Sequence, residues 1–291
     1  MSHGLPAVLW MGGGGAAGKT TISRTIALRF DLAWYRIDGY AYEHQDRLVA
    51  RGLVDKPDDD YDRRLLTPTA EELAEQFWER SRLTVPLVPD DLRTMDGAVG
   101  VVVEGPQLFP ELVAPYLAGP GSGLWLVSTE QFQRRVLGAR VGDASGFTSD
   151  AQRALDNLVR RNLLLNDRTM AQARARGLSV FEVDGSRDLP AMTAQVVAHF
   201  AEVLSTPPAV RSGQQRRELR QRENDAAMRN VYAYLVEVGQ PARWRVPLVC
   251  ECEHLGCDAV TGMGPDEYEH ARAAARPIIA HDAAGTTGSR R

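Results

Sequence analysis

The sequence is poor in lysine and has no long apolar run. Of its 34 basic residues, only Lys19 and Lys56 are lysines. No run approaches the roughly 18 apolar residues of a membrane-spanning helix, and no basic segment followed by an apolar one opens the chain. We therefore expect a cytoplasmic protein without a membrane partner, in which a lysine at a special position is informative.

The chain also lacks a strong charge of either sign. Its 34 basic residues stand against 38 acidic ones, which gives a formal net charge of −4. A dedicated nucleic-acid binder carries a basic surplus, so nucleic acid is not an expected partner, although a local basic patch is still allowed. Hydrophobic residues make up 44% of the 291 residues, enough for an ordinary globular core. The oligomeric state is left open.

Short apolar runs alternate with helical stretches over the first 204 residues. We expect strands at 7–11, 32–37, 100–103, 124–127 and 179–183, with helices at 19–30, 40–51, 69–82 and 189–204. This alternation predicts an α/β fold with a five-stranded parallel sheet and helices on both faces. Ligands of such sheets bind at the carboxyl ends of the strands, where Asp38, Glu104 and Asp184 stand.

A Ser-Thr-Pro-Pro stretch at residue 205 interrupts the pattern. We expect a first domain over 1–204, a linker and amphipathic helix over 205–242, a small α+β module over 243–282, and a disordered tail over 283–291. The arginine-rich stretch 211–229 is expected to be a solvated helix face that continues as an amphipathic helix over 222–238, and a further helix is expected near 266–275. Because the linker stands between them, we expect the first domain and the module to behave separately.

Residues 13–20 match the phosphate-binding pattern G-x-x-x-x-G-K-[ST] between a strand and a helix. Small residues let consecutive backbone N–H groups surround a phosphate, and the following helix points its N-terminus at the same charge. Lys19 would reach the β- and γ-phosphates, and the Thr20 hydroxyl would face Mg²⁺. The expected nucleotide-binding set is Gly13, Gly14, Gly15, Ala16, Ala17, Gly18, Lys19, Thr20 and Thr21.

The surroundings of this loop favour a kinase over a switch or a motor. Neither lysine lies in the Asn-Lys-x-Asp of a GTPase, and the third strand ends in a single acid. Over residues 5–204 the chain resembles the P-loop small-molecule and nucleotide kinases, such as shikimate kinase, gluconate kinase and chloramphenicol phosphotransferase. The resemblance implies ATP-dependent phosphoryl transfer, with Mg²⁺, to a hydroxyl of a small molecule.

Two carboxylates are candidates for the chemistry. In the resembled kinases an acid at the end of the second strand faces the acceptor hydroxyl, and the matching residue is Asp38. It would serve as general base, although an aspartate beside Gly39 can equally cap a helix or close a turn. Glu104 would hold Mg²⁺ through water or bind the acceptor, with capping of its loop as the alternative.

Arginines gather between the fourth and fifth predicted strands, around residues 130–170. The segment resembles the helix–lid–helix of such kinases, whose arginines neutralise the migrating phosphoryl group. The alternative is a pair of exposed helices in an arginine-rich protein. The best catalytic candidates are Arg135 and Arg140 before the glycine-rich turn, with Arg160 and Arg161 after it.

The acceptor remains open at this stage. Residues 40–94 should form its pocket, and the acidic run at 58–60 would either meet a cationic acceptor or be a solvated loop. The acceptor would be a sugar, a nucleoside or an antibiotic-like compound, and a nucleoside or nucleotide kinase is a second hypothesis. A third is a nucleotide-dependent regulatory protein whose C-terminal module binds a partner. The sequence does not separate ATP from GTP.

Three cysteines lie within eight residues, at Cys250, Cys252 and Cys257. Three thiolates and one imidazole would complete a tetrahedral structural Zn²⁺ site. His254 lies inside the loop and His281 follows a later apolar run. The segment resembles a small Cys-containing module of actinobacterial proteins with a final histidine, which favours His281. Three reduced cysteines without metal are the alternative.

Overall fold

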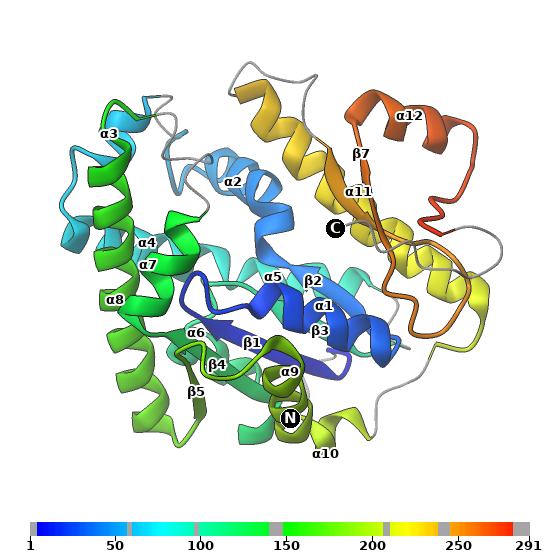
Figure 1. Ribbon diagram of the computed structural model, residues 1–291, viewed down its shortest axis with the longest axis horizontal. Helices are drawn as coiled ribbons and strands as arrows, with labels where there is room; N and C mark the ends of the chain where they lie inside the picture. Colours follow the sequence, from blue (N-terminus) through cyan, green and yellow to red (C-terminus); the bar gives the residue numbers. More distant parts are fainter. Residues whose placement is uncertain are drawn as a thin grey trace.

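The computed structural model describes residues 5–56, 60–95, 99–139, 148–205, 210–237 and 245–281. In these ranges five parallel strands form one sheet in the order β2-β3-β1-β4-β5 (Figure 1). They are β1 (Val8–Gly13), β2 (Ala33–Arg36), β3 (Val101–Glu104), β4 (Gly123–Ser128) and β5 (Ser179–Val183). The five-stranded parallel sheet expected from the alternating pattern is confirmed.

Helices connect the strands and cover the sheet. The main ones are α1 (Lys19–Arg29), α2 (Ala41–Ala50), α3 (Tyr61–Leu65), α4 (Ala70–Thr84), α5 (Leu87–Thr94), α6 (Pro110–Val113), α7 (Glu130–Gly138), α8 (Ala151–Arg176), α9 (Leu189–His199) and α10 (Ala201–Leu204). Short 3₁₀ turns η1 (Ile37–Tyr40), η2 (Ala114–Tyr116) and η3 (Pro120–Ser122) complete the connections. Among the described residues, no helix is both long enough and apolar enough to cross a membrane.

Alternating residues of the central strands build two cores, one on each face of the sheet. Trp10, Val103 and Trp125 pack with apolar side chains of α5 on one face. Met11 and Val102 pack with side chains of α1 and α9 on the other. The strands are therefore buried on both sides, as parallel strands between two helical layers must be.

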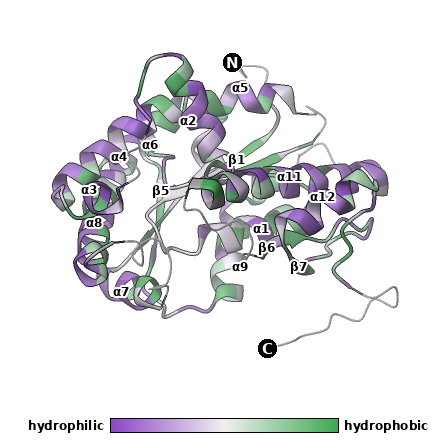
Figure 2. Cartoon of the chain, turned by 90° about the horizontal axis from the view of Figure 1, so that it is seen from above, coloured by the Kyte–Doolittle hydropathy of each residue, from purple (hydrophilic) through white to green (hydrophobic). Residues whose placement is uncertain are grey.

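The C-terminal part consists of α11 (Gly213–Glu237), the antiparallel pair β6 (Val246–Val249) and β7 (Val260–Met263), and α12 (Pro265–Ala273). Two strands and one helix agree with the small α+β module expected there. Helix α11 covers the arginine-rich stretch and its amphipathic continuation, and it packs along β2, η1 and α2. Figures 1 and 2 both show α11 and α12 at one end of the molecule and α3 and α8 at the other.

Three expectations concern residues outside the described ranges. They are the Pro207-Pro208 linker, the glycine-rich turn of the lid with Arg140, and the tail after residue 282.

Candidate active site

The loop between β1 and α1 requires glycine for steric reasons. Gly13 has a φ of +107°, and a Cβ there would lie 2.0 Å from the carbonyl oxygen of Leu126 on β4. A Cβ on Gly14 would lie 2.1 Å from Asn166 Oδ1 on α8. Gly18 precedes α1 with a φ of +76°. The loop is therefore held close to β4 and α8, with the N-terminus of α1 directed at its centre.

Lys19 and Thr20 occupy the first turn of α1, beside the carboxyl end of β3. The buried Lys19 ammonium donates a hydrogen bond to the Gly14 carbonyl at 2.6 Å. The Thr20 hydroxyl donates one to Glu104 Oε1 at 3.0 Å. Glu104 pairs in register with Met11 of β1, so this acid lies on the strand next to the one that leads into the loop.

The electrostatics tie Lys19, Glu104 and Asp38 into one site. Burial, strengthened by the negative charge of Asp38, raises the pKa of Glu104 to about 7. Burial also lowers the pKa of Lys19, while Glu104 and Asp38 act in the opposite direction. Asp38 lies exposed in η1 and accepts a hydrogen bond from the Gln107 amide at 3.3 Å. One edge of the sheet thus presents a cation and two carboxylates from three different strand ends.

Arg161 of α8 lies beside the phosphate loop. Its side chain lines a cavity of about 70 Å³ together with Gly13–Gly15, Phe77 and Phe109. The guanidinium donates to Asn162 Oδ1 at 2.8 Å and lies over the Phe77 ring, 5.4 Å from its centre. Burial lowers the pKa of Arg161 to about 10. Among the described residues, no carboxylate forms an ion pair with Arg161.

The other lid arginines lie elsewhere. Arg160 points toward α4 and pairs with Glu71 at 2.6 Å, with 68% of its side chain exposed. Arg135 lies over the Phe132 ring and approaches Gly185, just after β5. Arg140 lies outside the described residues. The structure thus brings Arg161 to the phosphate loop, brings Arg135 to the loop after β5, and directs Arg160 to the surface.

Several residues of this site were missed by the sequence reasoning. Asn162 and Asn166 of α8 lie against Gly15 and Gly14, and Asn166 also donates to the Ser128 carbonyl at 3.0 Å. Their spacing of four on an otherwise apolar helix face is a signal that could have revealed them. Gln107 gave no comparable signal, because its contact with Asp38 depends on the fold.

Some side chains of the expected acceptor segment, residues 40–94, have structural partners, and others lie near the phosphate loop. Asp60 caps α3 by accepting hydrogen bonds from two backbone N–H groups, and residues 58 and 59 lie outside the described ranges. His44 is buried against Tyr35 and Asp91. Phe77 lies in the cavity at the phosphate loop. Phe77, in the middle of α4, therefore reaches the loop, whereas His44 supports the core.

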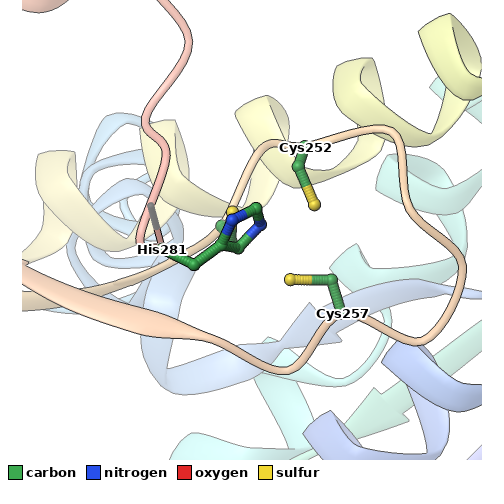
Figure 3. A group of neighbouring side chains, drawn as sticks. Cys252, Cys257 and His281 are labelled. Carbon is green, nitrogen blue, oxygen red and sulfur yellow. The ribbon is translucent and has the colours of Figure 1, made fainter. Parts of the chain in front are cut away.

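The three cysteines and His281 converge at the other end of the molecule. Figure 3 shows the Cys252, Cys257 and His281 side chains directed toward one another. With Cys250, their ligand atoms all lie within 4.8 Å of each other. Sulfur atoms around a tetrahedral Zn²⁺ stand about 3.8 Å apart, because each Zn–S bond is about 2.3 Å. The His254 ring centre lies 6.2 Å from that of His281 and outside this group.

Thiolate chemistry at this cluster agrees with metal binding. Burial opposes ionisation of Cys252, yet hydrogen bonds, led by one with His281, lower its pKa to about 6. Soft thiolates and one imidazole form a donor set that Zn²⁺ prefers and that Mg²⁺ and Ca²⁺ do not. The residues present therefore fit a structural zinc ion.

Comparisons with known proteins find no close relative. No family profile matches the chain, and no curated protein matches it significantly. A gluconokinase structure from Sinorhizobium meliloti is 16% identical over 69% of this chain and 94% of its own, with a TM-score of 0.40. A shikimate kinase structure from Bacteroides thetaiotaomicron is 16% identical over 68% and 98%, with a TM-score of 0.38. The strand order and the glycine loop after β1 show an α/β fold whose phosphate-binding motif lies at the carboxyl edge of a five-stranded parallel sheet.

Proposed function

We propose that the protein is an ATP-dependent phosphotransferase that moves the γ-phosphoryl group of ATP to a hydroxyl of a small molecule. One observation carries the proposal. The phosphate loop buries Lys19 and faces Arg161, and no carboxylate among the described residues neutralises either cation by an ion pair. A fold tolerates buried cations of this kind where a polyanionic ligand supplies the missing charge.

Mg²⁺ fits the oxygen donors at the end of β3. The Thr20 hydroxyl and the Glu104 carboxylate, 3.0 Å apart, are the residues that would hold it. The ion, when bound, neutralises charge on the β- and γ-phosphates. Lys19 and the loop amides would bind the same phosphates, and Arg161 would stabilise the charge of the group in transfer.

Asp38 is the residue that would accept the proton of the acceptor hydroxyl. It is exposed at the end of β2, and the Gln107 amide holds one of its oxygens. Its electrostatic influence on both Lys19 and Glu104 supports a position beside the phosphate site. Arg135, which lies beside Gly185 after β5, would pack on the nucleotide base.

The decisive experiment is a screen for ADP release with ATP and a panel of sugars, nucleosides and aminoglycoside-type compounds. We expect one class to raise turnover well above the rate with water alone. With that acceptor, Asp38→Asn should keep nucleotide affinity and lower the transfer rate by about 10²-fold. Slow ATP turnover that no acceptor changes would contradict the proposal and favour a regulatory nucleotide-binding protein.

We also propose that Cys250, Cys252, Cys257 and His281 hold one structural Zn²⁺ ion. The proximity of their four ligand atoms and their soft donor chemistry support it. Elemental analysis of protein purified without chelators should give close to one zinc per chain. His281→Ala should lower that occupancy, while His254→Ala should not. A zinc content below about 0.2 per chain would show a reduced-cysteine core.

A further inference from the structure

Strand β2 is an edge strand of the sheet, and α11 closes its open side. The Trp34 N–H on this side donates to Glu223 Oε1 of α11 at 2.9 Å. Arg220 pairs with Glu223 at 2.7 Å, and both side chains are at least 94% buried. An edge strand otherwise leaves such N–H groups without a protein partner.

The same helix also holds the far end of the phosphate-loop helix. Arg220 donates to the carbonyl of Ala27 in α1 at 3.2 Å. Arg216 forms a two-bonded ion pair with Asp31, in the turn between α1 and β2. Asp31 has a φ of +52°, an unusual conformation for a residue other than glycine, and the ion pair helps to fix it.

The adjoining side of α11 holds the module with the cysteine cluster. The Asn224 amide accepts from the Val249 N–H and donates to the Val249 carbonyl, both at 2.9 Å, so it pairs with the end of β6 like another strand. It also donates to the carboxylate of Glu251 at 2.8 Å. Glu251 is fully buried between the ligands Cys250 and Cys252.

Glu251 in turn holds the remaining parts of the module. Arg272 of α12 binds both of its oxygens, at 2.5 and 2.8 Å. The Ile278 N–H donates to it at 2.9 Å, three residues before the ligand His281. Arg216 adds a second link, because it donates to the carbonyl of Glu253, next to Cys252.

A continuous series of hydrogen bonds, with one peptide link between Glu223 and Asn224, therefore connects the Cys cluster to the phosphate-loop helix. It passes from Glu251 to Asn224, then to the neighbouring Glu223 and to Trp34. The Trp34 indole N–H donates to the Ser23 hydroxyl at 3.0 Å, and Ser23 donates to the carbonyl of Thr20 at 3.2 Å. Asp38 lies four residues beyond Trp34 in the chain.

We propose that Glu223 and Asn224 are positioning residues that couple the zinc centre to β2 and the phosphate-loop helix. Zinc occupancy then determines how firmly the strand leading to Asp38 is held. This inference rests on the zinc site proposed above and goes beyond it, since it makes the module part of the phosphotransferase. It does not depend on the identity of the acceptor.

Hydrogen exchange of the full chain, followed by mass spectrometry, tests this coupling. Exchange is compared for protein as purified, after zinc removal with a chelator, and after zinc is restored. We expect zinc removal to raise exchange at least tenfold in peptides covering residues 31–38, and zinc to reverse it. Peptides from β4 should change little, because β3 and β1 lie between β4 and β2 in the sheet.

Variants of α11 distinguish this coupling from a general loss of stability. Asn224→Ala and Glu223→Ala each leave the four ligands intact, so both should keep zinc, exchange fast in residues 31–38, and no longer respond to the chelator. Glu223→Gln keeps an acceptor for the Trp34 N–H and should restore the wild-type response. Glu218→Ala, an exposed change on the same helix, is the matched control. If Asn224→Ala fails to fold, Glu223→Ala tests the same path from its other side.

Three results would overturn the proposal. One is zinc removal that loosens residues 245–281 and leaves residues 31–38 unchanged. Another is a Glu223→Ala protein that still responds to the chelator as wild type does. The third is a purified protein without zinc. None of these readouts uses enzyme turnover, so failure of the kinase assignment remains a distinct outcome.

Discussion

Among the residues that the structure describes, buried charges are paired around α11 but not at the phosphate loop. Around α11 the buried charges are paired, as in Arg220 with Glu223 and Arg272 with Glu251. At the phosphate loop, Lys19 donates to a carbonyl and Arg161 to an amide, and no described carboxylate completes an ion pair with either. Burying a charge is costly unless it is paired. The difference agrees with a structural role for the first set and with the proposal that the second set binds a phosphate ligand.

Lys19→Ala should show the largest effect. Because the ammonium serves phosphate charge and not the core, we expect phosphoryl transfer to fall by about 10³-fold or more, with little change in stability. The other lysine, Lys56, is exposed and provides the matched Lys56→Ala control. Steady-state kinetics of both variants measure the loss of phosphoryl transfer, and thermal unfolding measures the change in stability. Near-normal turnover by folded Lys19→Ala protein would remove the basis of the kinase assignment.

Arg272→Ala, in contrast to Lys19→Ala, should lower the stability of the protein. It leaves the buried carboxylate of Glu251 without its cation, so we expect the free energy of unfolding to fall by about 3 kcal/mol. Arg245, whose ion pair with Glu267 is exposed, gives the control Arg245→Ala with a loss below about 1 kcal/mol. Denaturant unfolding measures both. Equal losses would mean that burial does not distinguish the two pairs.

Arg161→Ala and Arg160→Ala compare neighbours on one helix. Arg161 lines the cavity at the phosphate loop, whereas Arg160 forms a surface ion pair with Glu71. We expect the first change to lower the turnover number by about 10²-fold and the second to alter it less than about twofold. The sequence could not separate them. Turnover that depends on Arg160 instead would place the lid in another arrangement during catalysis.

Glu104→Gln tests how the free energy of unfolding depends on pH. The folded-state pKa of Glu104, about 7, lies above its ordinary value, so the folded protein holds this proton more tightly than the unfolded chain does. Its stabilising contribution is full below about pH 4.3 and is lost as the pH rises to about 7. We expect wild type to lose about 3 kcal/mol relative to Glu104→Gln over that range, without nucleotide or Mg²⁺. A difference independent of pH would contradict this raised pKa.

The sequence predicted those parts of the molecule that consecutive residues determine. The glycine loop with Lys19 and Thr20 is one continuous stretch, and the five strands follow from local apolar runs. Asn162 and Asn166 were missed because a helix of another segment brings them to the loop. Sequence spacing could not choose among the lid arginines, since the rotation of α8 decides which side chain points inward.

The C-terminal part shows the same limit. The cysteine spacing indicated a metal site. No local sequence pattern indicated that α11 would contact both β2 and β6. Glu223 and Asn224 are neighbours whose partners lie about 190 residues upstream and 25 residues downstream. The expectation of two separate units stays a prediction, and the contacts of α11 are the reason to test it by hydrogen exchange.

The fate of the γ-phosphate tests the proposed phosphotransferase activity most directly. Phosphorus NMR of ATP and Mg²⁺, incubated with the protein and the acceptor panel, follows this group. We predict that the γ-phosphate signal declines while a phosphate-ester signal and ADP grow in equal amounts, and that Lys19→Ala abolishes all three changes. Release of inorganic phosphate alone, at the same rate with and without every acceptor, would contradict the proposed phosphotransferase.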